Sequence, residues 1–182
     1  MAHLDTALFL PANIFINRLT SNPNYGRLFF HLLLASLSGY EIINKQLFYF
    51  ENLDNYNYIG EKCTIIAMQY FISDLYYVYN KPQYLFHHFI CIFGMTYAIT
   101  FEKYYILALY LYLGEISSIF LDLYILNIFK KMTKKLFMLN FAIFRLCLLP
   151  ILTIKSTENI YIFSLLCVDC SLHVYWTYKA LK

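Results

Sequence analysis

Nine ionisable residues lie within otherwise apolar stretches of the chain, and two of them are adjacent histidines. Such groups are expensive in hydrocarbon, so they usually face the interior of a helix bundle and mark a functional site there. A neutral imidazole in such a site can act as a nucleophile or as a general base near pH 7. The nine residues are His31, Asp74, His87, His88, Glu115, Asp122, Arg145, Asp169 and His173.

The spacing of these residues places some of them on common helix faces. Glu115 and Asp122 are seven residues apart, so on a helix they lie about 20° from the same face and roughly 10 Å apart along it. Asp169 and His173 are four residues apart, close enough for the carboxylate to accept a hydrogen bond from the ring and fix its tautomer. We therefore expect two carboxylates facing one interior and a carboxylate–imidazole pair on another helix.

The other residues allow both structural and functional interpretations. His87 and His88 are about 100° apart on a helix, so both can border one cavity, and packing alone does not explain an adjacent histidine pair. His31 is either an interhelical hydrogen-bond partner or a member of the site. Arg145 lies five residues before Pro150, where it can satisfy carbonyl groups freed by the proline or pair with a buried carboxylate.

The composition indicates which kind of structural element positions these residues. With 60% apolar, 20% aromatic and 14% charged residues among 182, the chain has too little polar surface for a soluble domain, and no nucleic-acid partner is expected. Apolar runs of about 20 residues predict an all-α polytopic membrane protein with about six spans. The spans are expected at Leu28–Phe50, Cys63–Tyr79, Tyr84–Thr100, Tyr104–Phe129, Leu136–Ile154 and Ile160–Ala180.

Short linkers between these runs predict antiparallel neighbours in one bundle with a central cavity and no second domain. Residues 24–182 form this domain, and residues 1–23 are expected to form an interfacial segment. Within that segment Ala7–Ile16 is broken by Pro11 and is too short to cross a membrane. Met1–Asp5 has no features of a removable signal peptide, so the first span is expected to act as the signal.

The basic residues predict the orientation. Six spans place nine lysines and arginines on one side and three on the other, so both termini are expected in the cytosol. The run Lys130–Lys135, expected in a linker, is the strongest cytosolic marker. It is interpreted as a topology signal that also attracts anionic lipid head groups. The alternative is that it draws an anionic substrate such as a CoA thioester to the cytosolic mouth.

Neither a metal site nor metal-dependent lipid oxidation is predicted. Cys167 and Cys170 have the spacing of a metal or redox pair, but a lone pair within an apolar helix lacks further ligands at matching spacing. Membrane hydroxylases and desaturases use more histidines than the five present here, and Tyr84 occupies the position that would complete an HxxHH box. A proton-linked transporter is also disfavoured, because no internal repeat is found and few Gly or Pro residues break the helices.

Several of these residues occur in motifs that resemble the TLC domain family, which includes the ceramide synthases. Tyr70–Leu75 is followed by His87-His88 thirteen residues after Asp74. The resemblance covers about Asn24 to Lys179. It is also carried by Asn24–Arg27 leading to His31, by Gly114–Ser118 with Asp122, by Phe144-Arg145 with Pro150, and by Trp176.

The resemblance implies a lipid acyltransferase in the endoplasmic reticulum. In the ceramide synthases the histidine pair is taken to pass an acyl group from acyl-CoA to a lipid amine. For this chain the expected catalytic residues are His87, His88, Asp74, Asp122 and Glu115, with His31, Arg145, Asp169 and His173 binding substrate. Acyl-CoA is the expected co-substrate, no bound cofactor is expected, membrane lipids are the expected partners, and a homodimer is left open. The alternative is a non-catalytic TLC protein that binds lipid or escorts cargo in the early secretory pathway.

Overall fold

The computed structural model describes residues 22–47, 50 and 52–181, and the regular secondary structure within these ranges is helical. The predicted interfacial segment, residues 1–23 with Ala7–Ile16, lies almost entirely outside the described residues. The helices are α2 (Pro23–Asn44), α3 (Tyr58–Val78), α4 (Pro82–Phe101), α5 (Tyr105–Leu113), α6 (Glu115–Ile125), α7 (Lys130–Phe141), the π-helix η1 (Ala142–Leu148), α8 (Leu149–Lys155) and α9 (Ile160–Leu181).

Local sequence explains where several helices begin. The Asn22 side chain accepts a hydrogen bond from the Asn24 amide at 3.0 Å, and Pro23 stands at the first position of α2. The Asn57 side chain caps α3 by accepting from the Gly60 amide at 2.7 Å. Asparagine at the N-cap and proline at the first helical position are both favourable, because the first amides of a helix have no partner within it.

Four helical segments of the described residues are long and apolar enough to cross a membrane. They are Pro82–Phe101, Tyr105–Ile125, Lys130–Lys155 and Ile160–Lys179, and each overlaps a predicted span. Helices α2 and α3 have 22 and 21 residues, so each is more than about 30 Å long, but their sequences are more polar. The all-helical membrane fold is confirmed, whereas the count of six spans stays a prediction.

The contacts between the helices form a closed ring around an interior. Helix α2 packs on α3, α5 and α6, α3 packs on α4, and α4 packs on α9. The ring is closed because α9 packs on η1 and α8, while α7 packs on α6. Side chains that point inward from helices far apart in the sequence can therefore meet.

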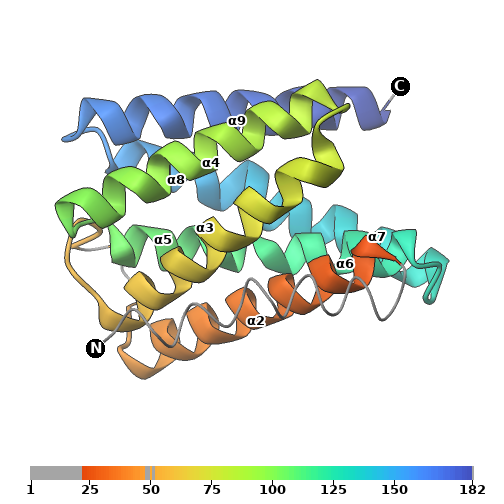
Figure 1. Ribbon diagram of the computed structural model, residues 1–182, viewed down its shortest axis with the longest axis horizontal. Coiled ribbons are helices and arrows are strands. Elements are labelled where there is room, and N and C mark those ends of the chain that lie inside the picture. Colours follow the sequence, from red (N-terminus) through yellow and green to blue (C-terminus); the bar gives the residue numbers. More distant parts are fainter. Residues whose placement is uncertain (1–21, 48–49, 51, 182) are drawn as a thin grey trace.

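One end of the ring is more basic than the other. The start of α2, the α3–α4 turn, the α6–α7 turn and the end of α9 lie together, at the right of Figure 1. The run Lys130–Lys135 lies at this end, but within α7 rather than in a linker as expected. The chain turns earlier, through Leu126–Phe129, where Asn127 and Phe129 adopt positive φ angles of 62° and 47°.

The apolar core fills the opposite part of the ring, between α2, α3 and α5. Its fully buried members include Phe30, Leu34, Cys63 and Leu109. Gly60 allows α3 to approach α5 closely, because an added Cβ would lie 2.5 Å from the Tyr105 carbonyl oxygen. The close approach of α3 to α5 packs this part of the bundle tightly.

Candidate functional site

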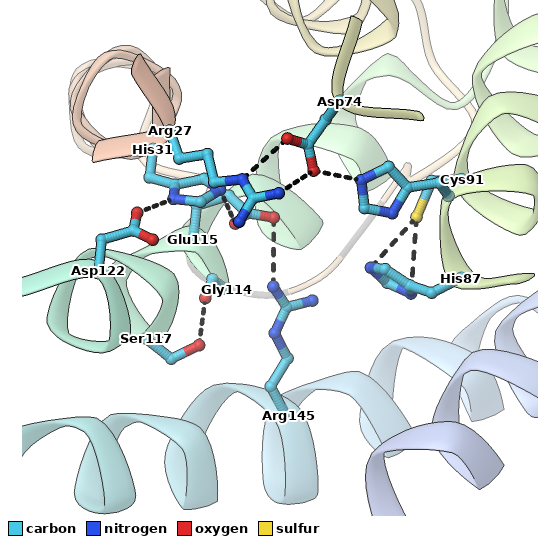
Figure 2. A network of polar contacts seen from close by, with 11 residues as sticks. Arg27, His31, Asp74, His87, Cys91, Gly114, Glu115, Ser117, Asp122 and Arg145 are labelled. Atoms are coloured by element: carbon cyan, nitrogen blue, oxygen red, sulfur yellow. Dashed lines mark hydrogen bonds and ion pairs between the residues drawn. The ribbon is translucent and has the colours of Figure 1, made fainter. Parts of the chain in front are cut away.

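The nine ionisable residues expected at the site all point into the ring. Eight of them are buried, and Arg145 is half-buried. Figure 2 shows side chains from α2, α3, α4, α6 and η1 facing one another across the interior. They form three groups of contacts, each of which joins different helices.

The first group links α2, α3 and α4 through Asp74. Arg27 donates from Nε to Asp74 Oδ1 at 2.8 Å and from Nη2 to Oδ2 at 3.2 Å. His88 Nε2 lies 2.9 Å from Asp74 Oδ2. The guanidinium thus binds the carboxylate through both of its oxygens, an arrangement that is stronger and better oriented than a single contact. Asp74 in turn holds the His88 ring.

The second group surrounds His31. Its Nδ1 lies 2.7 Å from Asp122 Oδ2, and its Nε2 lies 3.4 Å from Glu115 Oε2. The Nδ1 contact is short enough for a hydrogen bond with the Asp122 carboxylate as acceptor, whereas the Nε2 contact with Glu115 is an ion-pair distance. The His31 ring therefore bridges two carboxylates that lie on one face of α6.

Arg145 completes the second group by donating from Nη2 to Glu115 Oε1 at 3.2 Å. Of its two expected roles, the structure shows the pairing with a carboxylate. Arg145 lies in the π-helix η1, a rare conformation that often occurs at functional sites. Gly114 makes room for it, because an added Cβ would lie 3.0 Å from the guanidinium carbon.

The third group joins α4 and α9. His87 Nδ1 lies 2.8 Å from Asp169 Oδ1, and His173 Nε2 lies 3.6 Å from Asp169 Oδ2. The Trp176 ring packs edge-on against both histidines, with centroids 5.5 Å from His87 and 5.1 Å from His173. The spacing of Asp169 and His173 predicted that they would interact, but the shorter contact of Asp169 is with His87.

Along the chain, the members of these contacts occur in the order Arg27, Asp74, the histidine pair, Glu115, Arg145 and Asp169. A family model described as the TLC domain matches residues 23–182. The chain belongs to the TLC domain family. No curated protein and no solved structure matched it.

A polar cavity of about 520 Å³ occupies the basic end of the TLC domain. Both members of the histidine pair, His31, Asp74 and Asp122 line it. Arg27, Lys81 and Lys179 line it as well, and they belong to the end of the ring where α2 begins and α9 ends. The cavity is therefore bordered by positive charge at the end of the bundle and by paired charges inside it.

An apolar pocket of about 110 Å³ extends from the polar cavity toward the other end of the TLC domain. Apart from the residues that both spaces share, its walls are mostly aliphatic and aromatic, with Met95, Leu107 and Leu166 among them. The two spaces share Phe71, His87, Glu115 and Arg145 as lining residues. His87 thus stands where the polar cavity meets the apolar pocket, whereas His88 lines the polar cavity.

The carboxylates determine which nitrogen of each paired histidine is free. His87 presents Nδ1 to Asp169, so this nitrogen is the donor and Nε2 keeps a lone pair. The nearest polar atom to that Nε2 given for the described residues is the Cys91 sulfur at 3.7 Å. His88 presents Nε2 to Asp74, and its Nδ1 is buried with no hydrogen-bond partner among the described residues. Each imidazole therefore offers one acceptor nitrogen.

The sequence analysis missed Arg27 as a member of the site. It was counted only as a basic residue of the cytosolic side and as part of a family motif. Its position four residues before His31 places both side chains on one face of α2, and that spacing was the available signal. Asp122, expected to be catalytic, contacts His31 and not the histidine pair, whereas Asp169, expected to bind substrate, contacts His87.

Proposed function

We propose that this TLC domain transfers an acyl chain from acyl-CoA to a lipid amine or hydroxyl, with His87 as the residue that contacts the acyl carbonyl. The observation that carries the proposal is the place of His87, between a polar cavity of about 520 Å³ and an apolar pocket. A fatty acyl thioester has a long apolar chain, a reactive carbonyl and a charged carrier. These three parts match the pocket, the imidazole and the basic cavity in that order.

The environment of His87 suits nucleophilic catalysis. Asp169 accepts a hydrogen bond from Nδ1 at 2.8 Å, so it fixes the tautomer and stabilises the ring when Nε2 gains a bond and the ring becomes positive. Nε2 attacks the thioester carbonyl, the carbon–sulfur bond breaks, and CoA leaves as a thiolate. An acyl-imidazole then remains, and one difficult step has become two easier ones.

The acceptor then attacks the acyl-imidazole carbonyl and the carbon–Nε2 bond breaks. The acceptor amine or hydroxyl loses one proton, and the CoA thiolate gains one, so the overall reaction is balanced. His88 is suited to accept that proton because its Nδ1 is unpartnered among the described residues while Asp74 holds its other nitrogen. Alternatively, His87 acts directly as the general base for the acceptor, without forming a covalent intermediate.

The charged walls support delivery of acyl-CoA from the cytosol. Arg27, Lys81 and Lys179 line the polar cavity at the basic end, and the positive-inside rule places such an end in the cytosol. If α2 and α3 also cross the membrane, the chain has six spans and both termini are cytosolic. We propose the endoplasmic reticulum as the location, as the relation to the ceramide synthases implies.

The test is incubation of the purified full chain with a long-chain acyl-CoA, with and without lipid amines and hydroxyl lipids. We expect release of free CoA and a covalent acyl mass on the peptide that contains His87-His88. His87→Gln should abolish the adduct. His88→Gln should retain the adduct but slow its transfer to the acceptor by about 10²–10⁴-fold, the usual contribution of a general base.

The control is Cys147→Ser, an exposed position in η1 that contacts neither space, which should react like the wild type. Release of CoA without an adduct at any time would favour the general-base route. Retained lipid binding with neither CoA release nor an adduct would overturn the proposal and favour the lipid-binding or cargo-escort function.

A further inference from the structure

His87, Asp169 and His173 form a compact group of metal-ligand types within the ring. One ligand atom from each of the three lies within 4.8 Å of the others, and all three residues are buried. His87 comes from α4, while the other two come from α9 with the i, i+4 spacing that puts them on one face. Two imidazoles and one carboxylate are a common donor set for transition-metal ions in proteins.

The hydrogen bonding of His173 is incomplete without a further partner. The residue is 2% exposed, and neither ring nitrogen has a hydrogen-bond partner among the described residues. Its Nε2 is 3.6 Å from Asp169 Oδ2, which is too long for a hydrogen bond. Buried polar groups are nearly always satisfied, so an orphaned imidazole calls for a ligand, a water molecule or an ion. The orphaned nitrogen lies beside a carboxylate, which favours a cation.

The charge of Asp169 supports the same conclusion. Two of the three carboxylates that line the polar cavity pair with an arginine: Arg27 contacts Asp74, and Arg145 contacts Glu115. The third, Asp122, pairs with His31. Among the described residues, the ion-pair partners of Asp169 are only His87 and His173. A carboxylate in hydrocarbon is costly unless it is neutralised or bound to a metal.

We propose that His87, Asp169 and His173 bind a zinc ion at the wall of the polar cavity. Zinc takes imidazole nitrogen and carboxylate oxygen at about 2.0–2.2 Å, so small side-chain rotations would bring the three ligand atoms into its coordination shell. Three protein ligands leave a fourth position open. His87 and His173 both line the polar cavity, so that position would be filled from the cavity, by water or by an oxygen of a lipid.

This site does not depend on acyl transfer, although it uses His87. While zinc is bound, the hydrogen bond from His87 to Asp169 is replaced by coordination, and one imidazole nitrogen is occupied. The competing explanation is that Asp169 only orients two imidazoles through hydrogen bonds, in which case no ion binds. Because metal binding is measured without acyl-CoA or acceptor lipid, its result and that of the acyl-transfer test can be told apart.

The experiment uses the full chain, purified in detergent without a histidine tag and equilibrated with Zn²⁺ or Co²⁺. We expect equimolar zinc by elemental analysis after removal of free metal, and a visible absorption band typical of four-coordinate Co²⁺ after cobalt loading. His173→Gln and Asp169→Asn should weaken metal binding by more than the roughly 10–100-fold that loss of an outer-shell partner costs.

The matched control is His88→Gln, which removes the neighbouring histidine, paired with Asp74 rather than with Asp169. It should bind as much zinc as the wild type. Size-exclusion chromatography and circular dichroism show whether each variant is folded. The cobalt spectrum of the wild type tests the site even if a variant fails to fold. Absence of zinc and cobalt binding in the wild type, or unchanged binding in a folded His173→Gln variant, would overturn the proposal.

Discussion

At the scale of single residues, the interior of this TLC domain contains buried pairs of oppositely charged side chains. Asp74 receives two hydrogen bonds from Arg27 and one from His88. Removing one member of a buried pair leaves the other charge uncompensated, which costs more than the pair itself contributes. The stability of the domain should therefore depend more on complete pairs than on any one of their members.

Arg27→Gln should lower the free energy of unfolding by about 3–5 kcal/mol, because it leaves Asp74 buried without its cation. The double variant Arg27→Gln/Asp74→Asn should be more stable than the sum of the two single effects, since no lone charge remains. Unfolding in detergent, followed by circular dichroism, measures each variant. The exposed Lys155→Gln is the control, with an expected change within about 0.5 kcal/mol. Additive effects of Arg27→Gln and Asp74→Asn would contradict the pairing.

At the scale of elements, two departures from regular helix geometry allow Arg145 to reach Glu115. Pro150 cannot supply the backbone hydrogen bond of a regular helix, and the preceding residues Ala142–Leu148 adopt a π-helix. On the facing segment, Gly114 separates α5 from α6 and leaves space for the guanidinium. A straight, regular pair of helices with a larger residue at position 114 would crowd this contact.

Gly114→Ala should destabilise the domain by about 1–3 kcal/mol, the usual cost of overpacking. The added Cβ would lie 2.9 Å from the Leu111 carbonyl oxygen and 3.0 Å from the Arg145 guanidinium carbon. Gly39→Ala is the matched control, since its Cβ would meet only the Leu113 side chain at 3.8 Å. It should be neutral or raise stability by about 0.5–1 kcal/mol. Thermal unfolding of both variants measures these changes in stability. Equal changes for Gly114→Ala and Gly39→Ala would contradict the crowding argument.

At the scale of the whole molecule, the ring gives the two ends different characters. The polar cavity is lined at one end by Arg27, Lys81 and Lys179, and Lys130–Lys135 lies at the same end in α7. The apolar pocket extends toward the other end. An amphiphile with its chain in the apolar pocket would leave an anionic head at the basic end, so we predict that the proposed substrate is supplied from the compartment that this end faces.

Orientation can be tested with epitope tags in sealed microsomes. A tag after Lys182 should be removed by added protease without detergent, because the positive-inside rule predicts that the basic end faces the cytosol. A tag inserted between residues 54 and 55, in the connection between α2 and α3, should be protected until detergent is added. Cleavage of both tags, or of neither, would show that the number of crossings between them is not odd and would contradict the six-span arrangement.

Much of the fold could be predicted because hydropathy and charge bias are local properties of the chain. Apolar runs indicated the segments that became α4, α5–α6, α7–α8 and α9, and the all-helical membrane class followed from composition. The predicted helix boundaries were less accurate where the backbone departs from regular helix geometry. Lys130–Lys135 was expected in a linker because it is strongly polar, yet basic side chains at a membrane surface can stay solvated while their backbone is helical.

The sequence by itself determined which residue types would occupy the interior, since ionisable groups in apolar runs must avoid lipid. Only the tertiary structure decided their partners: Asp169 for His87, Asp74 for His88, and both Asp122 and Glu115 for His31. These partners lie on different helices, and which of them meet depends on how each helix is rotated and crosses its neighbours. That geometry is set by packing across the ring, which no local pattern in the chain records.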